Sequence, residues 1–215
     1  MLEIKDISFS HKNKIFFENL NISLNQWDSL IICGISWSGK TSLLNILSSL
    51  KKTTKWDVCW KDKSIFNFGN SFLYSYRNQS VGVAFQDFRL IDDFSVVENI
   101  NLPFLIWKNH KDQYWFDYLV KHLEIEKILD KKINSISWGE KERVSIIKSL
   151  VHKPEILMLD EPGTYLDKQL KYKLYSLIKE YSKHNINIIV SHDEDIIDFF
   201  WVEKILENKN LIFYK

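Results

Sequence analysis

Hydrophobic and polar residues follow a strand-like pattern through the first third of the chain. Short segments rich in isoleucine and phenylalanine, with alternating apolar positions, predict strands over Leu2–Phe9, Ile15–Leu24 and Ser29–Cys33. Leucine and isoleucine then recur at helical spacing over Thr41–Leu50, and a further short apolar run predicts a strand over Val81–Phe85. This part of the chain therefore combines early antiparallel strands with one helix.

From about residue 87 to residue 134 the pattern changes to a polar, aromatic stretch with helical patches. Helices and strands alternate beyond it: helix Gly139–Val151, strand Ile156–Leu159, helix Lys168–Tyr181, strand Ile186–Val190, helix Glu194–Phe200 and a hairpin over Lys204–Tyr214 that turns at Asn208-Lys209-Asn210. Strands that alternate with helices predict an α/β fold with a mostly parallel sheet covered on both faces. Because we find no repeat, low-complexity tract or linker, we expect one folding unit over residues 1–215.

The charge balance and the cysteine count narrow the function classes. The 215 residues include 29 Lys and Arg and 28 Asp and Glu, and the formal net charge of +1 argues against a dedicated nucleic-acid binder. Apolar runs such as Ile156–Leu159 are far shorter than the ~20 residues of a spanning helix, and the N-terminal residues have no apolar signal core. Cys33 and Cys59 are too few for a disulfide framework. We therefore expect a soluble cytoplasmic protein.

One segment between a predicted strand and a predicted helix has the spacing of a phosphate-binding loop, G-x-x-x-x-G-K-[ST]. Its residues are Gly34, Ile35, Ser36, Trp37, Ser38, Gly39, Lys40 and Thr41. Backbone N–H groups of such a loop, with the positive end of the following helix, bind phosphate oxygens. Lys40 is then placed to reach the β- and γ-phosphates, and the Thr41 hydroxyl to ligate Mg²⁺. The plain alternative is a structural glycine turn before a helix.

Two adjacent acids, Asp160 and Glu161, follow a buried apolar strand. This order directs Asp160 toward a Mg²⁺ ion and leaves Glu161 free to act as general base on, or to position, an attacking water. Acids also end strands without any chemistry, so the pair alone is a weak signal. In combination with the upstream phosphate-binding loop, it predicts a site for a nucleotide and a metal ion.

Several further segments resemble, in order along the chain, the motifs of ABC-type ATPases. They are Gln86 within Val83–Leu90 for the Q-loop, Ser137-Trp138-Gly139-Glu140-Lys141-Glu142-Arg143-Val144 for the LSGGE-x-x-R signature, Tyr165-Leu166-Asp167 for the D-loop and Val190-Ser191-His192-Asp193 for the switch histidine. Phe85–Leu90 and Glu98–Pro103 are similar to the subgroup that serves lipoprotein release, macrolide-type efflux and cell division. The resemblance covers nearly the whole chain. It implies a P-loop, RecA-like α/β core with an antiparallel β lobe and a helical lobe around residues 87–138.

The resemblance also implies a role for each matched residue. Gln86 would link the γ-phosphate and Mg²⁺ to the helical lobe, and His192 would contact the γ-phosphate and orient Glu161 and the water. Ser137, Trp138, Gly139 and Glu140 would face the ATP of the opposite subunit from a helix N-terminus, a position suited to anions. His11 aligns best with the family's adenine-stacking aromatic and Phe9 is the second choice, although both could simply be strand residues.

The partners implied by the resemblance are a second ATP-binding subunit and an integral-membrane permease. Two chains, in the simplest case two copies of this one, would close head to tail over two ATP molecules and reopen after hydrolysis to ADP and phosphate. The permease would dock near Gln86–Leu90 and hold the protein at the inner face of the cell membrane. No nucleic acid is expected, and the transported substrate is a property of the permease.

Tryptophan stands where the family has glycine at Trp27, Trp37, Trp56 and Trp138, with Trp107 a less certain fifth case. Average usage would give about 15 glycines, whereas the chain has 6 glycines and 8 tryptophans. In one explanation the protein is a degenerate ATPase that has lost turnover. In the other, the organism reads UGA as glycine and these positions are glycine in the native protein. The intact motifs around them favour the second explanation.

Other functions stay open at this point. Genuine indoles at Trp37 and Trp138 would favour a non-hydrolysing regulatory or structural subunit, because they would crowd the two phosphate sites. A cell-division-type ATPase that transports nothing shares the same motifs. A soluble ABC ATPase of DNA repair or translation usually carries a coiled-coil insertion or a second cassette, and neither is present.

Overall fold

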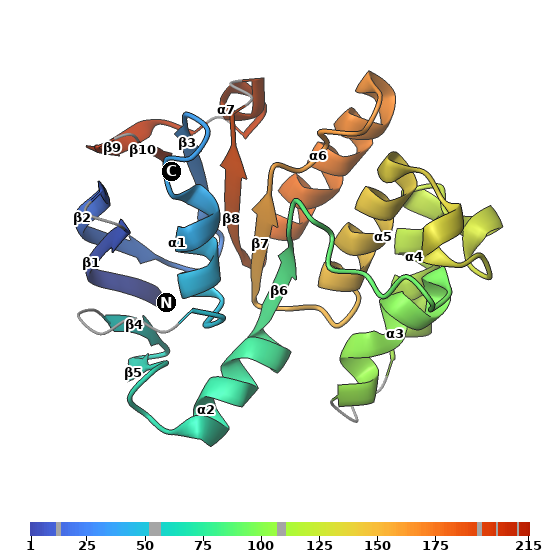
Figure 1. Cartoon of the computed structure of the whole chain (residues 1–215), viewed down its shortest axis with the longest axis horizontal. Helices are drawn as coiled ribbons and strands as arrows, with labels where there is room; N and C mark the ends of the chain where they lie inside the picture. The colour runs from blue at the N-terminus through green and yellow to red at the C-terminus, as the bar shows by residue number, and fades with distance from the viewer. Residues whose placement is uncertain (12–13, 52–56, 107–110, 193–194, 201, 210) are drawn as a thin grey trace.

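The computed structural model describes residues 1–11, 14–51, 57–106, 111–192, 195–200, 202–209 and 211–215. Its larger sheet has six strands in the order β6-β7-β8-β3-β10-β9. Their bounds are β3 Ser29–Gly34, β6 Val81–Ala84, β7 Ile156–Asp160, β8 Ile186–Ser191, β9 Lys204–Asn208 and β10 Leu211–Tyr214. Strands β6, β7, β8 and β3 are parallel, which confirms the predicted α/β core (Figure 1). Strand β10 pairs antiparallel with β3 and β9.

The two faces of this sheet are covered by different elements because side chains alternate along each strand. Leu30 and Ile32 of β3 pack with helix α1 (Lys40–Leu47) and with the antiparallel strands. Ile31 and Cys33 pack on the opposite side, with three later helices. These helices are α5 Trp138–Leu150, α6 Lys168–Ser182 and α7 Asp195–Phe200. Both faces are therefore buried, as the near-continuous apolar composition of the strands predicts.

A second, four-stranded antiparallel sheet lies beside α1, in the order β2-β1-β4-β5 (Figure 1). Its strands are β1 Leu2–His11, β2 Lys14–Leu24, β4 Asp57–Trp60 and β5 Lys63–Ser64. Apolar side chains of β1, such as Leu2 and Ile4, are buried against the core. This sheet is the expected antiparallel lobe, although β4 and β5 were not among the predicted strands.

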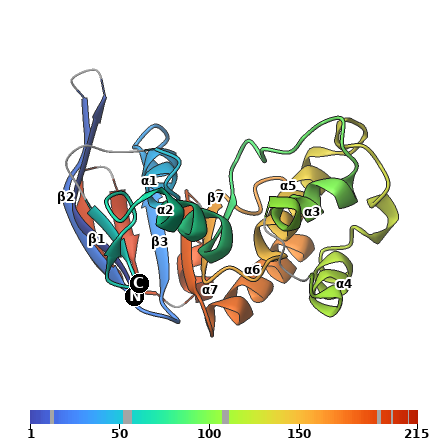
Figure 2. The same cartoon turned by 90° about the horizontal axis from the view of Figure 1, so that it is seen from below.

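The helical region between β6 and β7 packs on the side of α5 away from α1 (Figure 2). It contains α3 (Val96–Ile106), α4 (Gln113–His122) and the short turns η2 (Glu126–Ile128) and η3 (Ile133–Ser135). The buried Asn99 side chain accepts from Ile91 N–H and donates to the carbonyls of Ile91 and Ser95, which fixes the entry to α3. These elements lie within the helical lobe predicted around residues 87–138.

Helix α2 (Asn70–Ser75) and the π-helical turn η1 (Tyr76–Ser80) connect β5 to β6 and were not predicted. Tyr76 anchors them, because its buried hydroxyl donates to the carbonyl of Leu47 at 2.7 Å. None of the helices in the described ranges is both long and apolar enough to cross a membrane. The single domain over residues 1–215 stays a prediction.

Candidate nucleotide-binding site

A cleft of about 680 Å³ opens at the carboxyl ends of the parallel strands. Its lining comes from the loop after β3, the end of β7, the segments just after β6 and β8, and the antiparallel sheet. It brings together many of the residues singled out in the sequence: Ser36, Trp37, Ser38, Gly39, Lys40, Thr41, Gln86, Asp160, Glu161 and His192. Ligands of open α/β sheets bind at this edge.

The loop from Gly34 to Gly39 bends sharply between β3 and α1. Gly39 caps α1 with φ +99°, a conformation that L side chains rarely adopt. A Cβ at Gly39 would also lie 3.1 Å from the Cβ of Phe16, so the backbone approaches β2 closely here. The Ser38 hydroxyl is buried and finds no hydrogen-bond partner among the described residues. The loop thus brings backbone and an unsatisfied hydroxyl to the wall of the cleft, an arrangement suited to binding a phosphate.

Lys40 is the cation of this loop. Its ammonium group donates to the carbonyls of Gly34 at 2.7 Å and Ile35 at 3.3 Å. It also lies 3.6 Å from Oε1 of Glu161, and both side chains are more than nine-tenths buried. A buried charge needs compensation, and the Glu161 carboxylate and the two carbonyls supply it. An arriving phosphate can take the place of these carbonyls.

Thr41 and Asp160 form the candidate metal site. The Thr41 hydroxyl donates to Oδ2 of Asp160 at 2.8 Å across 119 residues of sequence. Burial raises the pKa of the Asp160 carboxyl, the hydrogen bond from Thr41 opposes this rise, and the nearby Glu161 charge adds to it. A divalent cation would compensate the Asp160 charge.

The oxygen donors present suit Mg²⁺, which binds through one or two carboxylates together with substrate phosphates and water. Within the described ranges no three His, Cys, Asp or Glu side chains form a metal-binding group. An ion at this position would therefore depend on Thr41, Asp160 and Gln86 together with the nucleotide.

Glu161 and His192 form the second polar pair of the cleft. One carboxylate oxygen, Oε2, lies 2.7 Å from Nδ1 of His192 and accepts the backbone N–H of the same residue at 3.0 Å. The N–H of Glu161 donates to Val190 O, which joins the ends of β7 and β8. The second oxygen, Oε1, faces Lys40. The carboxylate is held in one orientation and can accept a proton from a water in the cleft.

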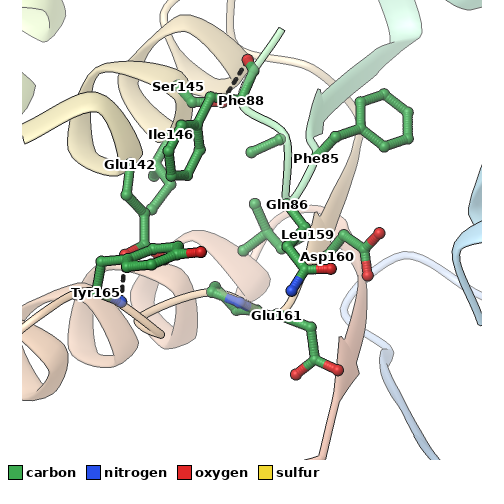
Figure 3. Close-up of a pocket in the computed structure, with 12 residues that line it drawn as sticks. Phe85, Gln86, Phe88, Glu142, Ser145, Ile146, Leu159, Asp160, Glu161 and Tyr165 are labelled. Carbon is green, nitrogen blue, oxygen red and sulfur yellow. Dashed lines mark hydrogen bonds between the residues drawn. The ribbon is translucent and has the colours of Figure 1, made fainter. Parts of the chain in front are cut away.

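Gln86 follows strand β6 and lies beside Asp160 at the edge of the sheet (Figure 3). Its side chain is exposed and borders the cleft. The segment that continues from it reaches α5, since the Phe88 carbonyl accepts from the Ser145 hydroxyl at 3.1 Å. Gln86 therefore lies between the candidate metal site and the segment that leads into the helical region.

The signature residues lie apart from the cleft of their own chain. Ser137 caps α5, and Trp138, Gly139 and Glu140 form its first turn. Ser137 and Glu140 make a reciprocal capping box, with Oε2 of Glu140 accepting from the Ser137 N–H at 2.7 Å and from its hydroxyl at 2.8 Å. None of these four residues lines the cleft that contains Lys40. They meet a nucleotide only if a second molecule supplies it.

Two aromatic side chains, Phe9 and Phe16, and the cation Lys51 also line the cleft. The Phe9 and Phe16 ring centroids lie 5.4 Å apart, and the Lys51 ammonium lies 4.0 Å from the Phe9 centroid. The side chain of His11 lies outside the described residues. The sequence did not indicate Phe16 or Lys51, because neither belongs to a motif. Phe16 reaches the cleft through the pairing of β2 with β1.

The tryptophans at expected glycine positions have unequal backbone conformations. Trp27 has φ 81° and Trp37 φ 65°, values that favour glycine over a bulky residue. Trp37 is 89% exposed and borders the cleft. Trp138 is helical and 60% exposed, and its ring lies 5.7 Å from those of Phe88 and Tyr165. Trp56 and Trp107 lie outside the described residues.

Comparison with known proteins decides the family. The ABC transporter family profile matches residues 17–164, more than half of the chain. The chain belongs to the ABC transporter family. The lipoprotein-releasing system ATP-binding protein LolD of Buchnera aphidicola from Acyrthosiphon pisum is 30% identical over 98% of this chain and 93% of its own length. The ergothioneine transport ATP-binding protein EgtV of Helicobacter pylori is 30% identical over 91% of each chain.

Two solved structures agree with this assignment. The dimeric structure of MJ0796, described as a bacterial ABC transporter cassette, superposes with a TM-score of 0.83 at 26% identity over 98% of this chain and 97% of that one. A post-hydrolysis dimer of the same cassette, bound to ADP and Pi, gives 0.82 over 93% and 91%. The protein is thus an ABC-type ATPase, the ATP-binding and ATP-hydrolysing subunit that powers a separate permease. The fold and family expected from the motifs are confirmed.

Proposed function

We propose that this ABC ATPase works as a head-to-tail homodimer that holds two Mg²⁺–ATP at its interface and drives an integral-membrane permease from the inner face of the cell membrane. One observation carries the proposal: Asp160, Glu161 and His192, which come 119 or more positions after Thr41 in the sequence, meet Thr41 and Lys40 in one cleft. The support from relatives is a cassette that forms a dimer and ATP-binding proteins named for lipoprotein release.

The residues of the cleft divide the work. Loop N–H groups and Lys40 bind the β- and γ-phosphates, with phosphate oxygens replacing the carbonyls that Lys40 now contacts. Thr41, Asp160 and Gln86 hold Mg²⁺, which supplies charge neutralisation at the transferring phosphoryl group. Glu161 accepts the proton of the attacking water, and His192 keeps its carboxylate oriented. The part of the cleft lined by Phe9 and Phe16 suits the base, with His11 the alternative stacking residue.

The second subunit supplies what one chain lacks. Ser137, Trp138, Gly139 and Glu140 stand at the N-terminus of α5, where N–H groups and the helix dipole favour an anion. The capping interaction with Glu140 occupies the Ser137 hydroxyl in the isolated chain. In the closed dimer a phosphate of the partner's nucleotide takes over that hydroxyl. ATP binding then favours closure, and hydrolysis favours opening.

The permease docks in a groove of about 460 Å³ between the core and the helical lobe. Leu50, Ile91, Leu102 and Pro103 give its apolar lining, and Arg77, Arg89 and Lys148 add positive charge. This combination fits a short amphipathic helix of the permease with an acidic residue. Arg89 lines this groove and Gln86 lies three residues before it in the sequence. Docking of the permease can therefore shift Gln86 and so change the metal site.

Glycine at positions 27 and 37 of the native protein is part of the proposal. The positive φ values of Trp27 and Trp37 support it. If the indoles are genuine, Trp37 at the phosphate loop and Trp138 at the partner's phosphate favour the second candidate, a subunit that binds nucleotide without hydrolysing it. A cell-division-type complex that transports nothing is compatible with either chain.

The deciding experiment compares ATP turnover by this chain with turnover by a Trp37→Gly/Trp138→Gly chain. The double-glycine chain is expected to hydrolyse ATP, and Glu161→Gln in that chain serves as the control for contaminating ATPase. No turnover in either chain overturns the proposal. Peptide sequencing of the native protein over Cys33–Lys40 by mass spectrometry then reads position 37 directly. Tryptophan there, with turnover confined to the glycine chain, favours the non-hydrolysing subunit.

A further inference from the structure

Glu142 is a buried carboxylate that no motif assignment uses. It belongs to the second turn of α5, and only 4% of its surface is exposed. Its two oxygens accept three consecutive backbone N–H groups of the segment that follows β7. Figure 3 shows the bond from Tyr165. Oε1 accepts from Gly163 at 2.5 Å and Thr164 at 3.2 Å, and Oε2 accepts from Tyr165 at 2.9 Å.

Burying the Glu142 carboxylate is unfavourable, and the three hydrogen bonds compensate for the water that it loses. Burial raises the pKa of Glu142, and the N–H groups of Tyr165, Gly163 and Thr164 oppose the rise. A buried carboxylate is tolerated only when hydrogen bonds replace its water. The segment Gly163–Tyr165 is therefore held in place by α5.

The middle residue of the same segment contacts the backbone of Glu161, the proposed general base. The Thr164 hydroxyl donates to the carbonyl of Glu161 at 2.8 Å. Glu161 itself has φ 54°, and its N–H donates to Val190 O. The backbone that orients Glu161 is thus continuous with the segment that Glu142 holds.

A second contact brings α5 against this segment. A Cβ on Gly139 would lie 2.7 Å from the Tyr165 carbonyl oxygen, so only glycine allows the two backbones to approach. Gly139 and Ser137 form the end of α5 that faces the partner's nucleotide in the proposed dimer. The segment after Glu161 therefore abuts the same helix twice, through Gly139 and through Glu142.

We propose that Glu142 is a positioning residue that makes the N-terminal half of α5 and the segment Glu161–Tyr165 move as one body. This inference rests on the proposed dimer. It links the general base of one nucleotide site to the signature residues that the same chain presents to the other site. Loss of the link slows hydrolysis and weakens the dependence of one site on the other. It leaves nucleotide affinity of the single chain unchanged, because Glu142 does not line the cleft around Lys40.

The test uses Glu142→Leu, which removes all three bonds, and Glu142→Gln, which keeps one acceptor oxygen. Ser149→Ala is the matched control, because this buried hydroxyl of α5 donates to Ile146 O within its own helix. The parent is whichever chain, original or double-glycine, hydrolyses ATP. The first readout is amide hydrogen exchange at residues 163–165. We expect exchange about tenfold faster in the Leu variant, an intermediate rate in the Gln variant, and the parental rate in the control.

The second readout is steady-state ATP hydrolysis. In Glu142→Leu, kcat is expected to fall at least about tenfold, with a lower Hill coefficient for ATP and an unchanged Kd for ADP. Glu142→Gln should recover part of kcat. Exchange that stays parental in the Leu variant overturns the tether. Faster exchange with parental kcat and Hill coefficient overturns the positioning role and leaves a structural one. A parent without turnover instead overturns the proposed function, so the two failures give different results.

Discussion

Nδ1 of His192 lies 2.7 Å from Oε2 of Glu161, and these two residues directly follow the neighbouring parallel strands β8 and β7. The same oxygen accepts the His192 N–H, so two bonds from one residue fix the carboxylate. Its other oxygen remains on the side of Lys40 and the cleft. Oε2 is therefore the oxygen that fixes the carboxylate, and Oε1 is the oxygen that can accept a proton from water in the cleft.

Substitutions of Glu161 and His192 test these two roles, base for Glu161 and orientation for His192. Glu161→Gln is expected to lower kcat about a thousandfold, because a general base contributes 10²- to 10⁴-fold, while ATP binding is retained. His192→Ala removes the side-chain bond but keeps the backbone bond, so its loss should be smaller, about a hundredfold. Single-turnover hydrolysis and ATP titration measure both effects. A Glu161→Gln chain with parental turnover would contradict the assignment of the base.

The metal site predicts a specific Mg²⁺ dependence. Thr41→Val removes the hydroxyl that contacts Asp160 and should raise the Mg²⁺ concentration for half-maximal turnover about tenfold. Thr41→Ser keeps the hydroxyl and serves as the matched control. Titration of turnover with Mg²⁺ at saturating ATP gives the comparison. Equal Mg²⁺ dependence in the Val and Ser variants would remove Thr41 from the metal site.

The buried charge of Asp160 predicts a pH dependence of stability in the absence of nucleotide. Burial raises the pKa of Asp160 in the folded chain above its ordinary value of 3.8. A raised pKa means that the folded state binds the proton more tightly, so this stabilisation is complete below about pH 4 and lost as pH rises through the folded pKa. The free energy of unfolding of Asp160→Asn should therefore rise relative to that of the parent as pH increases from 4 to 8. The total gain is about 1.4 kcal/mol for each pKa unit by which the folded pKa exceeds the unfolded one.

Urea unfolding at several pH values measures this difference, with the exposed Asp92→Asn as control. The predicted sign is opposite to that of an acid stabilised by a salt bridge. If the free energy of unfolding of Asp160→Asn instead falls relative to the parent as pH rises, the hydrogen bond from Thr41 has a larger effect on the pKa of Asp160 than burial has.

Two residues near the cleft, Phe9 and His11, are candidates for stacking on the base. Phe9 borders the cleft, so Phe9→Ala should weaken ADP binding about tenfold or more, since stacking on a base contributes about 1–3 kcal/mol. His11→Ala is then expected to have little effect. Isothermal titration with ADP separates them. If only His11→Ala weakens ADP binding, His11 and not Phe9 is the residue that stacks on the base.

The tryptophans predict opposite effects of glycine at different positions. Trp27→Gly and Trp37→Gly relieve a left-handed backbone that costs about 1–2 kcal/mol, partly offset by the larger entropy of the unfolded glycine chain. Each should stabilise the protein by about 0.5–1 kcal/mol. Trp138→Gly lies in a helix and should destabilise it by about 0.5–1 kcal/mol. Thermal unfolding of the three variants tests the pattern, and a common sign at all three would contradict the backbone argument.

Much of the fold was predictable because its signals are local. The strand, loop and helix around Lys40 follow from the order of residues within a short segment, and the observed bounds differ from the predicted ones by few positions. Helix α1 ends at Leu47 rather than Leu50 because Ser49 adopts φ 61°, which ends the helical hydrogen bonding. That conformation leaves no clear mark in the sequence.

Relationships between distant segments were not predictable from one sequence. Phe16 reaches Gly39 only because β2 pairs with β1, and Lys51 reaches Phe9 only through the fold of the antiparallel lobe. Glu142 stood inside a recognised motif at a position without an assigned role. Its contact with the segment after Glu161 depends on how α5 packs on the sheet. The roles of the matched motif residues stay predictions.

The pairing of β10 with β3 has a consequence for synthesis. Strand β3 carries the phosphate-binding loop, yet its two neighbours are β8, residues 186–191, and β10, residues 211–214. Both leave the ribosome more than 150 residues after β3 does. The nucleotide cleft therefore cannot form around β3 until translation has passed residue 192, because β8 and His192 are missing before then. Until that point an emerging chain exposes the unpaired edges of β3. Nascent chains of this protein should gain ATP affinity late and abruptly during translation.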